Sequence, residues 1–425
     1  MTRERGLFLT AGMALVAVFA AIGSSASLHT RVGYFLALYG FAFAAYVLGV
    51  RIAFRAEPDR WLLGVMLAVA VVARAVLVPA HPDLSTDIHR YLWEGRVVLH
   101  GGNPFALAPA DSSLTFMRDD GFELVNHRDM ATIYPPLAQG AFALGAWLHP
   151  TVTMLKALFV LFDIATVMVL MKLLRARGRS PGHALVYAWS PLVILETGHS
   201  GHLDALGVFF LVCGILLLTG RRERWGFVAL GAAFLAKYLT VVLLPFFVVR
   251  RRWAGILIVV AVAVVGYLPF AGAGAELVRS LRTYSGTWWF NGPPFMALSG
   301  ILGEPITARR LLAAAGIVFA IAAAFRERDL ARYTYLVIGC SLLLAPTVYP
   351  WYLIWMVPFL CIFPNRGWIA FTGLVALSYW VWVVYAASGA WIVPTRVLAA
   401  EYIPFYLLLA WEAARGSRVE GERRG

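Results

Sequence analysis

Charged residues are scarce in this sequence. Only 14% of its 425 residues are Asp, Glu, Lys or Arg, whereas 61% are hydrophobic. Soluble globular chains are about one quarter charged and roughly half apolar, and a water-soluble core could not bury so large an apolar fraction. The composition therefore excludes an ordinary soluble domain and predicts an integral membrane protein.

Cysteine is also scarce, with three residues in the sequence. Cys213, Cys340 and Cys361 lie in apolar segments without any CxxC spacing. The three residues therefore indicate neither a disulfide framework nor a zinc site. We interpret them as small buried hydrophobic residues. An internal repeat is also missing, so the sequence does not predict pseudo-symmetric halves.

Apolar stretches close to the roughly 20 residues that cross a bilayer recur along the chain. The net charge of +13 does not indicate nucleic-acid binding, because the basic residues form short clusters between apolar stretches rather than one stripe. Under the positive-inside rule these clusters are cytoplasmic. They lie at 51–60, 172–179, 221–224, 250–252, 326–332 and the arginine-rich C-terminus.

This alternation predicts an all-α, polytopic transmembrane protein that forms a single membrane domain, residues 1–425, with both termini cytoplasmic. Lys237 interrupts the apolar stretch 225–249. A charge inside such a stretch predicts two half-helices there rather than one helix. The stretch 134–148 is expected to lie on the outer face, because a full crossing would break the parity. The N-terminus also resembles a cleavable signal peptide, whose removal would not change the remaining topology. The twelve predicted crossings are 7–27, 32–54, 60–79, 152–173, 183–197, 204–219, 253–270, 307–325, 332–346, 351–364, 368–388 and 395–412.

The long polar stretch 80–131 follows three predicted crossings and is therefore expected on the outer side. It carries eight acidic residues against four arginines, the reverse of the basic loops, and it is too long for a simple connector. We expect 80–131 to be the catalytic loop and 271–294, with its two tryptophans, to be a second outer loop. The turns at 196–204 and 349–352 are predicted on the same side.

Residues 85–100 have the spacing of an amphipathic helix at the membrane interface. Four residues fall on one stripe of this helix at about 100° per residue: Asp87, Arg90, Tyr91 and Glu94. This spacing predicts that the helix presents its two carboxylates together. The alternative is that 85–87 only cap the helix and that Arg90 only pairs with a neighbouring acid.

Four motifs in and after this helix resemble the first outer loop of bacterial GT-C glycosyltransferases. They are Asp87-x-x-Arg90-Tyr91-x-Trp93-Glu94-Gly95-Arg96, Gly101-x-Asn103-Pro-Phe105, Arg118-Asp119 and Thr132-Ile-Tyr134-Pro-Pro-x-Ala-Gln139. The resemblance is closest to the polyprenol-phosphate-mannose-dependent mannosyltransferases and the glycosyltransferase 87 group. Weaker matches lie at 198–204 and 349–352. Glu94 stands where the family often has Asp, and Phe105 stands where Tyr is usual.

The resemblance implies transfer of a hexose, with mannose expected, from a polyprenyl-phosphate sugar to a hydroxyl of a lipid or glycan. The reaction is expected to invert the anomeric centre, on the periplasmic or extracellular face of the plasma membrane. Such a transfer needs a carboxylate that accepts the acceptor's proton and negative charge near the oxocarbenium-like centre. We predict Asp87 as the base and Glu94 as the second catalytic carboxylate.

The predicted substrate-binding residues are Arg90, Tyr91, Arg96, Asn103, Tyr134, Gln139, His199, His202, Asp204, Lys237, Arg282, Tyr349, Trp351 and Tyr352. The basic members are candidates to bind the leaving phosphate, although Arg96 could instead extend to lipid headgroups. Lys237 is favoured because its own helix offers no partner. The aromatic members either stack on sugar or belong to the aromatic belt of a membrane protein.

No cofactor is expected. His199, His202 and Asp204 have a spacing that could hold a metal, but a glycine-flanked turn followed by a helix cap explains the same residues. We therefore predict substrate contact and no metal site there. The expected partners are the lipid-linked donor, a lipid or glycan acceptor and membrane lipids, without nucleic acid.

Two other functions fit parts of the pattern. A transporter or flippase of lipid-linked sugars also uses broken helices and intramembrane charges, but its ionisable residues should lie near the middle of the membrane. Here the polar residues gather at one face. A surface-polysaccharide polymerase or ligase shares the outer site and the lipid-linked substrate, and it differs only in moving a whole chain rather than one sugar.

Overall fold

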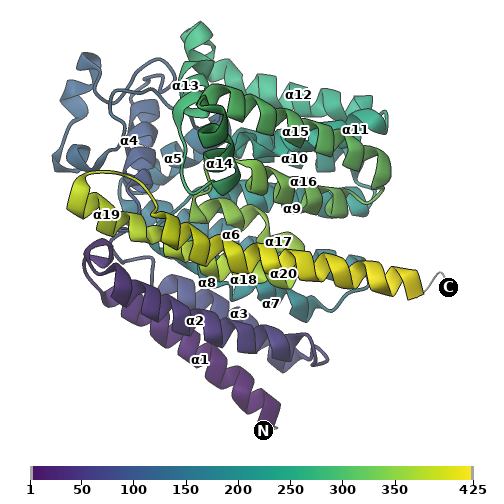
Figure 1. Ribbon diagram of the computed structural model, residues 1–425. Coiled ribbons are helices and arrows are strands. Elements are labelled where there is room, and N and C mark those ends of the chain that lie inside the picture. The colour runs from purple at the N-terminus through teal and green to yellow at the C-terminus, as the bar shows by residue number, and fades with distance from the viewer. Residues whose placement is uncertain (1–2, 423–425) are drawn as a thin grey trace.

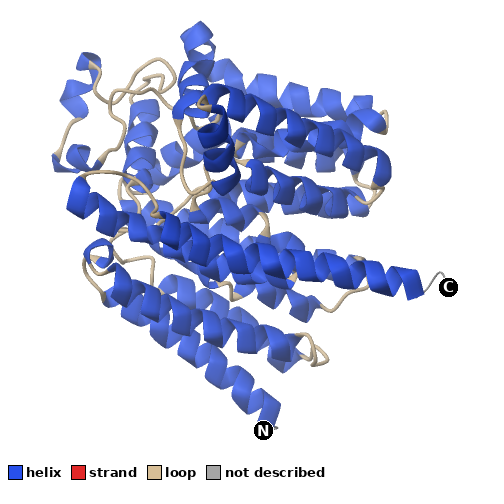
Figure 2. Ribbon diagram, in the orientation of Figure 1, coloured by secondary structure: helices blue, strands red, loops and turns tan. Residues whose placement is uncertain are grey.

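The computed structural model describes residues 3–422, and these residues form an assembly of helices (Figures 1 and 2). Within this range no β-strand is present, and an isolated bridge between Phe290 and Thr347 is the only β-type pairing. A helix satisfies its backbone hydrogen bonds internally, as a bilayer requires. The predicted all-α class is confirmed.

Seven helical stretches are long and apolar enough to cross a membrane, which confirms a multi-pass membrane protein. They are α1 (Arg3–Ser24), α2 (Val32–Ala53), α6 (Val152–Ala176), Trp253–Thr287 with α12 (Trp253–Tyr267) and α13 (Arg279–Thr287), α15 (Pro305–Arg326), Arg366–Ser388 with α18 (Arg366–Leu374) and α19 (Val381–Ser388), and α20 (Thr395–Glu422).

The other α-helices of the described chain are shorter. They are α3 (Arg60–Ala75), α4 (Asp87–Leu99), α5 (Pro136–Leu148), α7 (Leu185–Ala188), α8 (Pro191–Ile194), α9 (Asp204–Thr219), α10 (Glu223–Ala236), α11 (Leu244–Val249), α14 (Pro293–Leu302), α16 (Leu330–Leu344) and α17 (Val357–Leu360). The helix predicted within 85–100 is confirmed as α4, and the one predicted at 134–148 is confirmed as α5.

The predicted crossings at 183–197 and 351–364 are not single continuous helices. The first consists of α7, α8 and one π-helical turn, Leu195–His199, and the second of the 3₁₀ helix η8 (Pro350–Trp355) and α17. Pro191 breaks the first stretch, since proline disfavours helical geometry in the residue before it, and Ser190 has ψ 118°. In the second stretch, Pro358 lies in the first turn of α17. The side chains of both stretches are almost completely buried, so these apolar runs pack against protein rather than lipid.

The second predicted outer loop, 271–294, is also largely helical. It contains most of the 3₁₀ helix η7 (Leu268–Val278) and all of α13. The break predicted at Lys237 is confirmed. There the backbone is extended, with φ −158° and ψ 134°, between α10 and the 3₁₀ helix η6 (Tyr238–Leu243). Lys237 thereby lies at the break between the two helices.

The helices α4 and α5 pack against each other at very close range. A Cβ atom at Gly95 of α4 would lie 2.3 Å from the backbone oxygen of Phe142 in α5. Tyr91 stacks on the Phe142 ring, with the ring centres 4.6 Å apart and the planes 6° apart. Only glycine allows this backbone approach, which fixes the direction in which the first turn of α4 points.

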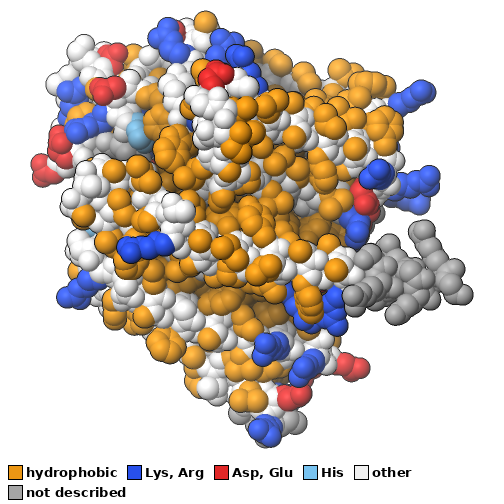
Figure 3. All heavy atoms as spheres, in the orientation of Figure 1, with side chains coloured by type: hydrophobic (Ala, Val, Ile, Leu, Met, Phe, Trp, Pro, Cys, Tyr) orange, Lys and Arg blue, Asp and Glu red, His pale blue; other side chains and the backbone are white. Residues whose placement is uncertain are grey.

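The basic clusters meet at one end of the molecule. Arg177 forms an ion pair with Asp329, and Arg252 lies 3.0 Å from Glu223, so loops far apart in sequence are neighbours. Figure 3 shows apolar side chains across the middle of the visible face and basic side chains around its edges, with acidic side chains among them at the upper left. In Figure 1, α4 and the 80–131 loop lie at the opposite side from the C-terminus.

Candidate functional site

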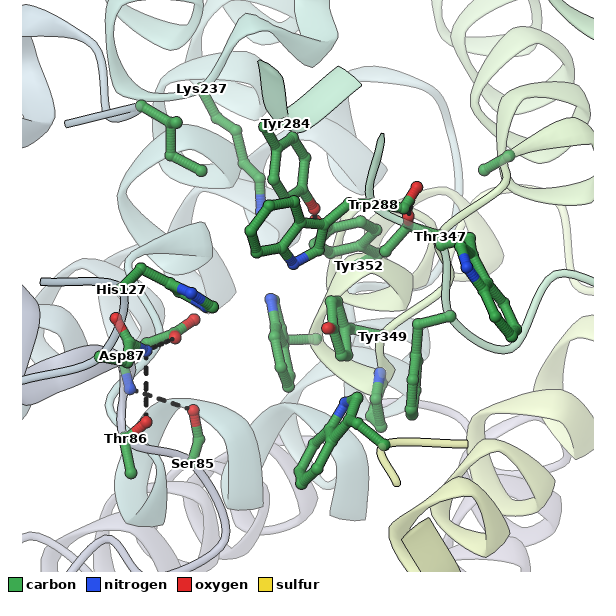
Figure 4. A pocket seen from close by; sticks show the side chains of 18 of the residues that line it. Ser85, Thr86, Asp87, His127, Lys237, Tyr284, Trp288, Thr347, Tyr349 and Tyr352 are labelled. Carbon is green, nitrogen blue, oxygen red and sulfur yellow. Dashed lines mark hydrogen bonds between the residues drawn. The ribbon is translucent and has the colours of Figure 1, made fainter. Parts of the chain in front are cut away.

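A cavity of about 1010 Å³ lies beside the first turn of α4. Its walls come from the start of α4, the 126–135 loop, the break at Lys237, the end of α13, η8 and the 378–391 segment (Figure 4). Sixteen of the 35 lining residues are aromatic, with His127 included. The aromatic lining residues are Tyr91, His127, Tyr134, Tyr238, Tyr284, Trp288, Trp289, Phe290, Tyr349, Trp351, Tyr352, Trp355, Tyr379, Trp382, Tyr385 and Trp391.

Asp87 is the first residue of α4 and faces this cavity. Its side chain is 23% exposed, and the Asn126 amide donates to its Oδ1 at 2.8 Å. Thr86 forms no capping bond. Burial raises the pKa of Asp87, although the bond from Asn126 and the nearby Lys237 oppose the rise. A carboxylate with a raised pKa, open to a cavity, has the properties of a general base.

Lys237 supplies the positive charge of the cavity wall. Its ammonium group pairs with Asp204, the first residue of α9, and lies 4.4 Å from the centre of the Tyr352 ring. The Trp355 indole also donates to Asp204 Oδ1, at 2.6 Å. The Lys237 side chain remains 26% exposed, so its other protons can reach a ligand in the cavity. An ammonium held in this way suits a phosphate.

Glu94 does not share the cavity with Asp87, so the prediction that α4 presents both carboxylates together is wrong. Glu94 is 2% exposed and accepts hydrogen bonds at 2.7 Å from both Thr132 and Gln139. It also pairs with Arg90 at 2.5 Å. The shared helical stripe did not reveal that the 126–139 segment covers the second turn of α4.

Arg90 likewise lies outside the cavity lining. Its guanidinium donates to three backbone oxygens of the 80–131 loop, those of Asn126, His127 and Met130, at 3.1, 2.8 and 2.6 Å. Arg90, Glu94 and Gln139 therefore form one buried network that holds the loop against α4. Because the loop carries Asn126, this network also fixes the residue that bonds Asp87.

Three further predicted binding residues lie outside the cavity lining. Arg96 pairs with Asp119 at 2.6 Å, Asn103 donates to the Phe270 backbone oxygen at 3.0 Å, and Arg282 is exposed on α13. The first two connect parts of the outer region. Arg282 belongs to a helix that turns Leu281 and Tyr284 toward the cavity instead.

His199, His202 and Asp204 are buried behind the cavity wall rather than in it. His199 Nε2 lies 3.7 Å from Asp83 Oδ1, and His202 Nδ1 lies 3.8 Å from Asp87 Oδ2. Burial lowers the pKa of both histidines. Within the described part of the chain, no group of three His, Cys, Asp or Glu residues is arranged to hold a metal.

The predicted aromatic residues of the 349–352 turn do line the cavity, as do Tyr91 and Tyr134. Tyr349 stacks on Trp351 with ring centres 4.4 Å apart and planes 4° apart, and Phe290 stacks on the other face of Tyr349 at 4.4 Å. These rings form one ordered wall rather than separate members of a membrane belt. Such a wall can stack on the apolar faces of sugars.

Sequence reasoning missed several residues of the site. Asn126, Tyr284, Tyr379, Trp382 and Trp391 gave no signal of their own, because aromatic residues near the ends of apolar segments are equally typical of the interfacial belt. Asn126 lies 39 positions from Asp87, and no periodicity connects two residues so far apart. Only the packing of the outer loop onto α4 brings them together.

One family model matches the chain, over residues 9–255. It is described as the MptA_B family: alpha-(1->6)-mannopyranosyltransferase, N-terminal domain. The match covers more than half of the sequence and includes Asp87, Asn126, Asp204 and Lys237, while the aromatic wall of 284–391 lies beyond it. No curated protein matches the chain.

Proposed function

Because the chain belongs to the alpha-(1->6)-mannopyranosyltransferase family and is a multi-pass membrane protein, we propose that it takes mannose from a polyprenyl-phosphate-mannose donor. The acceptor is a hydroxyl of a lipid or glycan, and the site opens to the outer face of the plasma membrane. The family assignment favours this enzyme over a transporter, and single-sugar transfer over movement of a whole chain.

The observation that carries the proposal is the pairing of opposite charges on one cavity. Of the residues described, Asp87 is the only carboxylate and Lys237 the only lysine or arginine in the cavity lining. Asp87 accepts the proton of the acceptor hydroxyl as the new glycosidic bond forms. Lys237 stabilises the negative charge that develops on the leaving lipid phosphate. Base and cation thus act at opposite ends of one displacement.

The single carboxylate supports inversion. A retaining mechanism through a glycosyl-enzyme needs a nucleophile and an acid/base about 5 Å apart, and Glu94, the other candidate, is buried in the network with Arg90. A lipid phosphate leaves without needing a proton from an acid. One direct displacement, with Asp87 as the base, therefore needs only the groups that line this cavity.

The acceptor is recognised by stacking and by the position of one hydroxyl. The aromatic wall gives sugar rings flat apolar surfaces, and the family's α-(1→6) linkage makes a primary hydroxyl at C6 the nucleophile. A primary hydroxyl extends from the ring, so it can reach Asp87 while its ring rests against the aromatic residues that line the cavity. We propose no cofactor, because Lys237 can donate to the phosphate, and a chelator should leave transfer unchanged.

The orientation follows from charge. The basic clusters meet at one end of the bundle, which the positive-inside rule assigns to the cytoplasm. The 80–131 loop lies away from that end. Both termini are accordingly cytoplasmic, and the cavity faces outward.

The donor class is tested with the purified protein in detergent and a synthetic mannoside acceptor. We expect label to pass from polyprenyl-phosphate [¹⁴C]mannose but not from a mannose nucleotide, and NMR of the product to show an inverted anomeric centre. Transfer from the nucleotide alone would refute the lipid-phosphate donor. A product that retains the donor's configuration would refute the single displacement.

A further inference from the structure

Behind Asp87 lies a buried row of polar side chains that the proposed reaction does not use. His202 is completely buried, and its two ring nitrogens face two different carboxylates: Nδ1 lies 3.8 Å from Asp87 Oδ2, and Nε2 lies 3.6 Å from Glu196 Oε2. Glu196 Oε1 in turn accepts the hydroxyl of Tyr379 at 2.6 Å. Both His202 nitrogens and Glu196 Oε2 are buried without a direct hydrogen-bond partner.

The position of His202 is strongly constrained by its surroundings. Its backbone amide donates to the backbone oxygen of Glu196 at 2.8 Å. Its ring stacks on Trp351, with the ring centres 3.8 Å apart and the planes 15° apart. The preceding Gly201 has φ +70°, and a Cβ there would lie 2.2 Å from Ile88. Glycine is therefore needed at this turn, and the imidazole is held edge-on between the two acids.

We propose that His202 is a positioning residue for Asp87: protonated on Nδ1 alone, it donates to Asp87 Oδ2, while Glu196 donates to Nε2 and so fixes this tautomer. The proposal rests on Asp87 being the base. Every donor then has an acceptor in one direction, from Tyr379 through Glu196 and His202 to Asp87, while Asn126 holds the other Asp87 oxygen. Tyr379, Glu196 and His202 keep their protons during the reaction.

The two distances that this arrangement uses are longer than a direct hydrogen bond. Hydrogen bonds at catalytic groups are often long before substrate binds and tighten in the complex. Trp351 stacks on His202 and also lines the cavity. A sugar that contacts Trp351 from the cavity can therefore shift the imidazole stacked on it. We infer that the base is aligned in this way when the acceptor is present.

The protonation state of Glu196 agrees with a donor role. Glu196 lies outside the seven spanning stretches, and burial is the main cause that raises its pKa to about 8. Below that pH it keeps its proton and can donate to His202. The titratable groups that face Glu196 are Tyr39 on α2, Asp87 on α4, His202, Asp204 on α9 and Tyr379.

This arrangement predicts an alkaline limit to transfer. As the pH rises through about 8, Glu196 loses its proton and becomes an acceptor, so the His202 proton moves to Nε2. The bare Nδ1 lone pair then faces the Asp87 carboxylate, and the base loses its alignment. Glu196→Gln keeps an N–H donor toward His202 and cannot ionise, so this variant should stay active and lose the alkaline limit.

The experiment measures kcat and donor KM from pH 5 to 10 for wild type, Glu196→Gln, His202→Leu and His202→Asn. His202→Leu should lower kcat about 10-fold or more, but by no more than the roughly 10²–10⁴-fold that a general base contributes, with little change in KM. His202→Asn, whose amide can replace the Nδ1 donor, should recover part of that loss. His199→Asn is the matched control, since it changes a neighbouring buried histidine that faces Asp83, and it should keep the alkaline limit.

Two outcomes would overturn the positioning role. One is an alkaline limit in Glu196→Gln that equals that of wild type, and the other is a folded but inactive Glu196→Gln. Glu196→Gln is nearly isosteric, so its result does not depend on whether His202→Leu folds. An active Asp87→Asn would instead refute the base itself, which separates failure of the proposed function from failure of this inference.

Discussion

Replacing Lys237 with methionine should affect stability and donor use separately. Asp204 is 1% exposed and would lose its countercharge. Breaking a buried ion pair costs about 3–5 kcal/mol, but the Lys237 side chain is 26% exposed, which reduces the cost to about 1–3 kcal/mol, the range for an unsatisfied buried group. The variant should therefore unfold at a lower temperature in detergent.

The effect on the donor follows from the phosphate contact. A hydrogen bond to a charged group contributes about 1.5–3 kcal/mol, which corresponds to a fall of about 10- to 150-fold in kcat/KM for polyprenyl-phosphate mannose. The assay is initial-rate transfer of label at several donor concentrations, with equal amounts of folded protein.

A double variant separates the two effects. Lys237→Met with Asp204→Asn removes both charges, so it should regain most of the thermal stability without regaining donor use. Arg282→Met is the matched control, because it removes an exposed basic residue outside the cavity lining; it should behave like wild type. A double variant that uses the donor as well as wild type would refute the phosphate role of Lys237.

Two further predictions concern the packing and the base. Gly95→Ala should destabilise the protein by about 1–3 kcal/mol through overpacking against the α5 backbone, whereas Gly140→Ala on α5, where a Cβ meets nothing within 4 Å, should not; thermal unfolding measures both. Asn126→Ala removes a hydrogen bond that favours the ionised form of Asp87, so its pKa should rise further. Since the base must be ionised, the acid limb of the pH–rate profile should move to higher pH, and an unchanged limb would contradict the assignment.

Much of the fold could be predicted from the sequence. Apolar runs of spanning length indicated the helical membrane class, the period of 85–100 indicated α4, and a single charge within an apolar stretch indicated the break at Lys237. These features depend on local sequence alone. The segments 183–197 and 351–364 could not be distinguished from spanning helices, because an apolar run buried in protein has the same composition as one facing lipid.

The site was predictable only in part. Asp87, Lys237 and the 349–352 aromatic residues line the cavity as expected, but Glu94 does not, although it shares a helical stripe with Asp87. The difference arises because the 126–139 segment covers the second turn of α4 and leaves the first turn open. Contacts of this kind join residues far apart in sequence, and helical periodicity carries no information about them.

The most direct test of the account compares Asp87→Asn with Asp129→Asn, the same chemical change at an exposed acid of the same outer loop. Transfer from polyprenyl-phosphate [¹⁴C]mannose is measured in membranes with matched amounts of each protein. We predict that Asp87→Asn lowers the rate about 10²–10⁴-fold, the usual contribution of a general base, and that Asp129→Asn transfers at the wild-type rate. Wild-type transfer by Asp87→Asn would contradict the account.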